Sequence, residues 1–207
     1  MIKPPTTIYL IRHGEVHNPG KVLYGRLPHF RLTAAGKQQA QTAGRYLNGK
    51  TIMALYSSPL LRARQTAQEI QRQISVPKLH VSILLNEVCT AYEGQPSEHV
   101  DARQGDIYTG TAACFEQPPD VVTRSRKFIL RMRQRYPNKC VAAVTHGDVI
   151  TFTALWALGW PPTPKNKTRL LKAGFPAAYP AHASITALTY LTDNAQERPD
   201  IAYVNLS

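Results

Sequence analysis

The stretch TIYLIRHGE, residues 7–15, decides the fold, and a second stretch of the same pattern, CVAAVTHGD, occupies residues 140–148. In each, a short apolar run ends in a histidine that is followed by glycine. Such runs are typical of strands buried on both faces of a mostly parallel sheet. Ligands of parallel sheets bind beyond the carboxyl ends of the strands. We therefore expect His13 and His146 to lie over one pocket at that edge.

A third strand candidate, MALY at residues 53–56, is followed by SSPLLRARQTA at residues 57–67. Ser58 is a favourable helix N-cap, and Pro59 suits the first helical position. Arg62 then falls in the first turn of a helix, where free backbone N–H groups and the helix dipole favour an anion. Guanidinium groups bind phosphate oxygens bidentately, so this segment and the two histidines together predict a phosphate site.

Strand-like and helical periodicities alternate along the chain. We expect strands at 6–12, 51–56, 79–84, 140–145, 183–191 and 200–205, and helices at 33–48, 59–74, 119–136 and 149–159. This alternation predicts an α/β fold, a three-layer α/β/α sandwich with a mostly parallel central sheet. No linker divides the chain, so we expect one domain over residues 1–207. The glycine- and proline-containing segment 85–118 is too long for a simple connection and predicts a lid-like insertion over the pocket.

The composition narrows the class of protein. Part of the formal net charge of +12 lies within residues 124–135, where basic and apolar residues alternate at helical spacing. This pattern favours the solvated outer face of a packed helix, with attraction of anionic substrates or nonspecific nucleic-acid contact as the alternative. No dedicated nucleic-acid motif and no membrane-spanning apolar stretch is present. Three cysteines without metal-type spacing suit reduced thiols, and we expect a cytoplasmic protein.

The ordered motifs resemble the histidine phosphatase superfamily, also called the phosphoglycerate-mutase-like superfamily, and within it the small broad-specificity phosphatases. The matching stretches are RHGE at 12–15, LTAAG at 32–36, SSPLLRARQTA at 57–67, Glu87 with Glu93-Gly94, and THG at 145–147. This resemblance implies that His13 is the phosphorylated nucleophile and Glu87 the proton donor. It also implies that Arg12, Arg62 and His146 bind the phosphoryl group.

Several positions in this set have alternatives. Asn18 lies one residue nearer to His13 than the phosphate-contacting asparagine of the mutase pattern, and we include it among the phosphate-binding residues. Glu93 and Glu15 compete with Glu87 for the role of acid. The spacing His13-x-x-x-His17 invites a metal site, but this pair lies on a predicted loop without further ligands, so we expect none.

The residues support a definite reaction. A neutral histidine is a competent nucleophile when one ring nitrogen is free and the other is held by a hydrogen bond. Phosphoryl transfer mainly requires positioning and positive charge on the phosphoryl oxygens. Arg12, Arg62 and a protonated or N–H-donating His146 supply that charge without a cofactor. We therefore expect a metal-independent phosphomonoesterase that acts on a small phosphorylated substrate through a phosphohistidine.

Two other functions stay open. The first is a phosphoglycerate mutase-type phosphotransferase, which is disfavoured because segment 85–118 does not resemble the mutase substrate loop. The second is a non-catalytic phosphate-binding regulatory protein, which is disfavoured because the full set of catalytic residues is present. The sequence leaves the substrate open among sugar phosphates, phosphoglycerates, nucleotides, phosphoproteins and a cobalamin-precursor phosphate. It also leaves the oligomeric state open.

Overall fold

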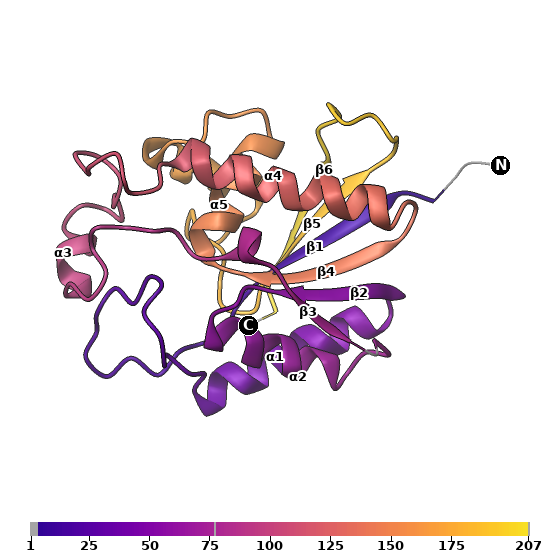
Figure 1. Ribbon diagram of the computed structural model, residues 1–207, viewed down its shortest axis with the longest axis horizontal. Helices are drawn as coiled ribbons and strands as arrows, with labels where there is room; N and C mark the ends of the chain where they lie inside the picture. Colours follow the sequence, from indigo (N-terminus) through magenta and orange to yellow (C-terminus); the bar gives the residue numbers. More distant parts are fainter. Residues whose placement is uncertain (1–3, 77, 207) are drawn as a thin grey trace.

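The two stretches that end in histidine form neighbouring strands at the centre of one sheet (Figure 1). The structure, a computed structural model, describes residues 4–76 and 78–206. Its six-stranded sheet has the order β3-β2-β4-β1-β5-β6. The strands are β1 Thr6–Arg12, β2 Ile52–Ser57, β3 Leu79–Val81, β4 Cys140–Thr145, β5 Ile185–Tyr190 and β6 Asp200–Val204. The first four strands pair in parallel, and β5 pairs antiparallel with both β1 and β6, so the predicted mostly parallel sheet is confirmed.

The strand register explains why the two histidines share one edge. Parallel pairing places Arg12 of β1 opposite Thr145 of β4, and each histidine is the next residue along its chain. Both strands are buried almost throughout because helices cover both faces of the sheet. His13 and His146 therefore leave the sheet side by side at the carboxyl ends of the central strands.

Helices form the two outer layers (Figure 1). They are α1 Ala34–Asn48, α2 Leu61–Gln71, α3 Ser97–Asp101, α4 Pro118–Arg135 and α5 Gly147–Ala157, with 3₁₀ helices at Ile83–Leu85 and Pro164–Ala173. One apolar core packs α1 and α2 against Ile11 and Leu55, and another packs α4 and α5 against Ile8 and Leu10. Alternate side chains of β1 thus enter opposite cores, as a strand's two-residue period requires. The predicted three-layer α/β/α sandwich is confirmed.

Several predicted element boundaries differ from the structure by one to three residues, and two of these differences bear on the site. Helix α2 begins at Leu61, so Ser58 is not its N-cap and Pro59 is not its first residue. The Ser58 hydroxyl instead lies 2.8 Å from the His146 ring, and this tertiary contact takes precedence over capping. Strand β3 ends at Val81 rather than 84, because the chain turns into the 3₁₀ helix Ile83–Leu85.

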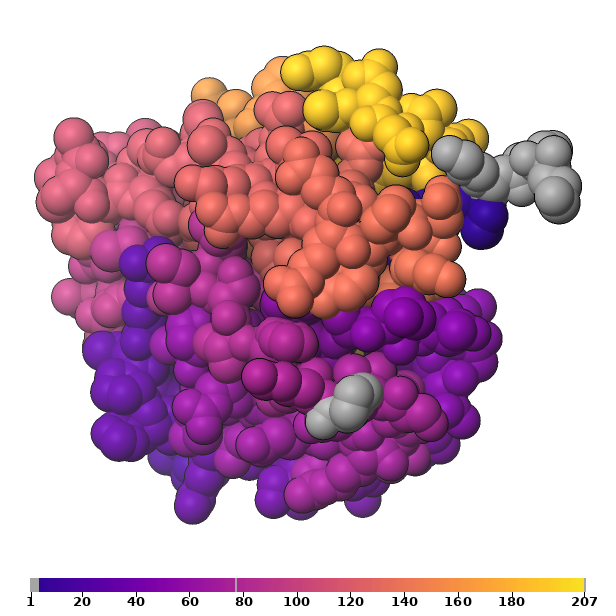
Figure 2. Space-filling view, turned by 45° about the vertical axis from the view of Figure 1, so that its right-hand side comes forward, coloured from indigo at the N-terminus to yellow at the C-terminus, as the bar shows by residue number. Residues whose placement is uncertain are grey.

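Loops gather beyond the carboxyl edge of the sheet. The loop 17–31 and the segment 86–117, which contains α3, lie side by side at one end of the molecule (Figures 1 and 2). Backbone hydrogen bonds join them, including Leu23 N–H to the Gln95 carbonyl at 2.8 Å. The sequence predicts one domain over residues 1–207. Of these, residues 1–3, 77 and 207 lie outside the described residues. Within the described ranges, no helix combines the length and apolarity needed to span a membrane.

The basic helix α4 departs from the expected solvated face at two positions. Its exposed basic residues are Arg126, Lys127, Arg131 and Arg135. Arg133 is instead buried, forms an ion pair with Glu197 at 3.0 Å and lies 3.9 Å from the centre of the Tyr190 ring. Arg124 is half-buried and forms an ion pair with Glu116 at 2.8 Å. Helical spacing alone does not distinguish these inward arginines, because their acidic partners lie on other segments.

Candidate active site

His13 lies directly beyond β1 with its ring held in one tautomer. Its Nδ1 atom lies 2.8 Å from the Gly14 carbonyl oxygen. A carbonyl oxygen can only accept, so Nδ1 carries the proton and Nε2 keeps its lone pair. Burial, together with the positive charges of Arg62 and Arg12, holds the pKa of His13 well below its usual value. His13 is therefore neutral at neutral pH, with the free ring nitrogen that a nucleophile requires.

His146 is fully buried at the start of α5, and its ring centre lies 5.4 Å from that of His13. Its Nδ1 lies 3.3 Å from a terminal guanidinium nitrogen of Arg62, which can only donate. Its Nε2 therefore carries the proton and donates to the Ser58 hydroxyl at 2.8 Å. Burial and the charge of Arg62 lower the pKa of His146 well below its usual value. His146 is therefore neutral at neutral pH, with Nδ1 accepting from Arg62 and Nε2 donating to Ser58, and its expected contact with a phosphoryl group stays a prediction.

The arginines carry unpaired donors beside the histidines. Arg62, 1% exposed, donates to the Gly25 carbonyl at 2.6 Å, and Arg12 donates to the Pro180 carbonyl at 2.7 Å. The buried Nε atoms of both arginines have no hydrogen-bond partner among the described residues. An unsatisfied buried donor costs roughly 1–3 kcal/mol, so these two donors favour the binding of an anionic acceptor.

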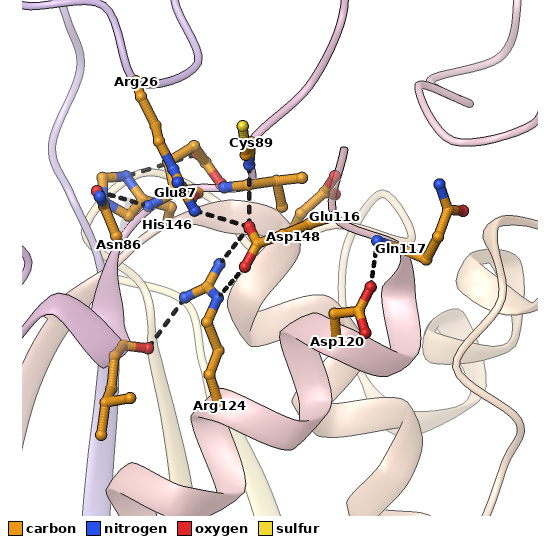
Figure 3. A network of polar contacts seen from close by, with 12 residues as sticks. Arg26, Asn86, Glu87, Cys89, Glu116, Gln117, Asp120, Arg124, His146 and Asp148 are labelled. Carbon is orange, nitrogen blue, oxygen red and sulfur yellow. Dashed lines mark hydrogen bonds and ion pairs between the residues drawn. The ribbon is translucent and has the colours of Figure 1, made fainter. Parts of the chain in front are cut away.

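Glu87 lies shortly after the 3₁₀ helix Ile83–Leu85, and its carboxyl lies near His146 and Arg62 (Figure 3). One carboxylate oxygen accepts from the Val88 N–H at 2.9 Å. The other lies 3.5 Å from His146 Nδ1 and 3.9 Å from the Arg62 guanidinium. Burial raises the pKa of Glu87 to about 7, with the charge of Asp148 adding to the rise and Arg62 opposing it. A large fraction of this carboxyl is therefore protonated at neutral pH.

A cavity of about 220 Å³ joins these groups. Its lining includes Arg12, His13, Asn18, Glu87, Asp148 and Tyr179. Arg62 and His146 lie immediately behind this lining, in contact with Gly25 and Glu87 respectively. The structure thus brings together all the sequence-predicted site residues, in one small space at the carboxyl edge of the sheet.

Asn18 reaches the cavity but uses its carboxamide within its own loop. Its amide nitrogen donates to the Val22 carbonyl at 2.8 Å, and its oxygen accepts from the Val22 N–H at 3.2 Å. These two bonds close the loop around residues 18–22. Asn18 therefore shapes one wall of the cavity in this structure, and phosphate contact remains an expectation.

The competing acids lie elsewhere. Glu15 accepts from the Thr33 hydroxyl at 2.7 Å, and Glu93 accepts from the backbone N–H of Arg26 at 2.6 Å. Of the three glutamates compared, only Glu87 lines the cavity. In residues 4–76 and 78–206, no group of three or more His, Cys, Asp or Glu side chains is placed to hold a metal ion.

Asp148 and Tyr179 are among the residues of the cavity wall that sequence reasoning missed. Asp148 accepts from Lys167 at 2.9 Å and from the Tyr108 hydroxyl. Its place directly after Thr145-His146-Gly147, in the first turn of α5, was a usable signal. For Tyr179 the sequence held only an indirect signal, the glycine at position 147. A Cβ on Gly147 would meet the Tyr179 hydroxyl at 2.1 Å. The glycine after His146 is thus required by a close approach from a distant loop.

Comparisons with known proteins show the family to which the chain belongs. Residues 8–190 match the family model described as the histidine phosphatase superfamily (branch 1). The uncharacterized phosphatase PhoE of Bacillus subtilis (strain 168) is 30% identical over 147 residues, which cover 70% of this chain and 74% of that protein. The uncharacterized protein Rv0525 of Mycobacterium tuberculosis is 49% identical over 65 residues, 31% of this chain. The chain therefore spans about a third, 32%, of the length of that relative.

A solved structure, mycobacterial glucosyl-3-phosphoglycerate phosphatase Rv2419c, is similar in fold. Its TM-score is 0.75 at 22% sequence identity, and the match covers 96% of this chain and 97% of that one. Fold, site geometry and family match all agree, and the chain belongs to the histidine phosphatase superfamily. PhoE and Rv2419c are both named as phosphatases.

Proposed function

We propose that this protein is a metal-independent phosphomonoesterase that transfers a phosphoryl group to His13 and then to water. The observation that carries this proposal is the free Nε2 of a neutral His13 in a cavity beside two unpaired arginine N–H groups and a protonatable Glu87. A phosphate monoester needs these three things, namely a nucleophile, positive charge on its oxygens and a proton for its leaving group.

The residues divide the reaction into two steps. In the first, His13 Nε2 forms a bond to phosphorus, the ester P–O bond breaks, and Glu87 gives its proton to the departing alcohol oxygen. In the second, Glu87 takes a proton from water as the water oxygen attacks phosphorus, and the N–P bond breaks. Inorganic phosphate leaves, and both side chains return to their starting states. Arg12 and Arg62 bind the phosphoryl oxygens throughout.

His146 takes up a different role once phosphate is bound. A phosphoryl dianion between the arginines stabilises the charged imidazolium and raises the pKa of His146. The ring then donates to a phosphoryl oxygen instead of accepting from Arg62. Through this change, a histidine whose pKa is lowered by burial contributes positive charge when a phosphoryl group is bound.

A second cavity, of about 480 Å³, adjoins the first and is the proposed place of the alcohol part of the ester. The two cavities share Leu23, Ile107, Asp148 and Tyr179 in their walls. The segment 86–117 contributes to both, so we propose that it acts as the lid over the substrate. The larger volume favours alcohols bulkier than glycerol.

A panel of phosphate esters assayed with and without excess EDTA tests the proposed function. Phosphate release should persist with EDTA, because arginine and histidine side chains neutralise the phosphoryl oxygens. Loss of activity on chelation, restored by Mg²⁺ or Zn²⁺, would contradict the metal-free mechanism. Transfer of phosphate between positions of phosphoglycerate would favour a mutase, and binding without release of phosphate from any ester would favour a regulatory protein.

The pH dependence should reflect Glu87. Burial raises the pKa of Glu87 to about 7, so the proton needed by the leaving group is lost as the pH rises through that value. We expect kcat/KM toward an alkyl phosphate to fall above this pH, approaching about tenfold per pH unit. His13, with its lowered pKa, stays neutral there and contributes only at acid pH. If the alkaline fall persists unchanged in Glu87→Gln, another group is responsible for it.

A further inference from the structure

Three charged side chains from separate parts of the chain, those of Arg26, Glu116 and Arg124, meet beside the stretch that carries Glu87 (Figure 3). The Glu116 carboxylate accepts from a terminal nitrogen of Arg26 and from Arg124 Nε, each at 2.8 Å. It also accepts from the Cys89 backbone N–H at 2.9 Å. Glu116 ends the segment 86–117, whereas Arg26 belongs to the loop 17–31 and Arg124 to α4.

This network holds the backbone on both sides of Glu87. Arg26 Nε donates to the carbonyl of Glu87 itself at 2.7 Å. Arg124 donates to the Leu84 carbonyl at 2.9 Å, and Glu116 holds Cys89. Residues 86–90 belong to no helix or strand, so individual hydrogen bonds fix their path. These are the side-chain contacts just described and a backbone bond from the Glu116 N–H to the Cys89 carbonyl at 3.0 Å. The network contacts the backbone of this stretch, whereas the Glu87 carboxyl faces other partners, Val88, His146 and Arg62.

We propose that Glu116 is the positioning residue of the proton donor, acting through Arg26 and Arg124 to keep the Glu87 carboxyl beside the leaving oxygen. This inference rests on the proposed function of Glu87. Proton transfer demands that donor and acceptor lie within hydrogen-bond reach, and a small displacement of the backbone loses it. Without the carboxylate, Arg26 and Arg124 would repel one another and release the two carbonyls that they hold.

A comparison of two esters distinguishes a displaced proton donor from a general loss of active-site structure. An alkyl phosphate releases a basic alkoxide that needs a proton, whereas a nitrophenyl phosphate releases a stable phenolate that does not. In Glu116→Gln we expect the alkyl ester to slow by roughly tenfold or more on the chemical step, and the nitrophenyl ester by less than about threefold. Added to Glu87→Gln, the same substitution should cost the alkyl ester little more, because no transferable proton remains to be positioned.

Glu197 offers a matched control. It also pairs with an arginine, Arg133, at 3.0 Å and accepts the Leu191 backbone N–H at 2.7 Å. Its side chain is 16% exposed against 20% for Glu116, but it does not line the catalytic cavity. Glu197→Gln should leave the ratio of the two ester rates unchanged. Arg26→Met removes the donor to the Glu87 carbonyl and should give the same result as Glu116→Gln. It replaces Glu116→Gln in the experiment if Glu116→Gln does not fold.

The outcomes distinguish this inference from the proposed function. A selective loss on the alkyl ester in Glu87→Gln, Glu116→Gln and Arg26→Met supports both. Selective loss in Glu87→Gln alone, with equal losses on both esters in the other two variants, overturns the positioning role and leaves the acid in place. Equal losses on both esters in Glu87→Gln overturn the proton donor and, with it, the role of Glu116.

Discussion

Replacing His13 with alanine should abolish turnover and remove all covalent labelling of the protein by substrate. The neutral ring with a free Nε2 is the only nucleophile in our mechanism, so the rate loss should be on the order of 10³ or more. Wild-type protein mixed with a ³²P-labelled ester should carry label that is stable to alkali and labile to acid, as expected of a phosphohistidine. Rapid quenching during turnover measures both label and rate.

His80→Ala provides the control for this experiment. His80 lies on β3 with its ring stacked on Tyr56 and does not line the cavity, so its loss should leave labelling intact. Normal labelling of His13→Ala would place the nucleophile elsewhere, and His146, whose ring centre is 5.4 Å away, would be the next candidate.

Replacing Glu87 with glutamine should slow alkyl phosphates by roughly 10²–10⁴, the usual scale of general-acid assistance, and slow a nitrophenyl ester much less. Glutamine keeps the size of the side chain but has no transferable proton. The comparison must be made on the chemical step, because slow hydrolysis of the phosphohistidine would conceal the difference. Single-turnover rates with both esters measure it.

Glu93→Gln and Glu15→Gln are the matching controls, since both carboxylates accept hydrogen bonds from other groups and neither residue lines the cavity. Each should affect the two esters equally. A selective loss on the alkyl ester in either control would move the acid role to that residue. Equal losses in Glu87→Gln itself would assign Glu87 to binding or orientation of the substrate.

The layered fold was predictable because its signals are local. The buried strands β1 and β4 appear as short β-branched runs, and α1, α2, α4 and α5 as helical periodicities. Boundaries failed where another segment supplied the decisive contact. Ser58 resembles an N-cap in sequence, but its hydroxyl meets His146. Burial of Arg133 likewise depends on Glu197, a residue far along the chain.

The residue types that gather at the carboxyl edge of the sheet were predictable from the motifs, because a histidine that follows a parallel strand leaves the sheet at that edge. The chemical states of these residues depend on tertiary contacts. The Arg62 guanidinium, which is remote in sequence, selects the tautomer of His146, and burial raises the pKa of Glu87. The hydrogen bonds of the Glu116 carboxylate likewise join separate segments, through Arg26, Cys89 and Arg124. Desolvation and hydrogen-bond partners arise only when remote segments pack together, and no local pattern encodes them.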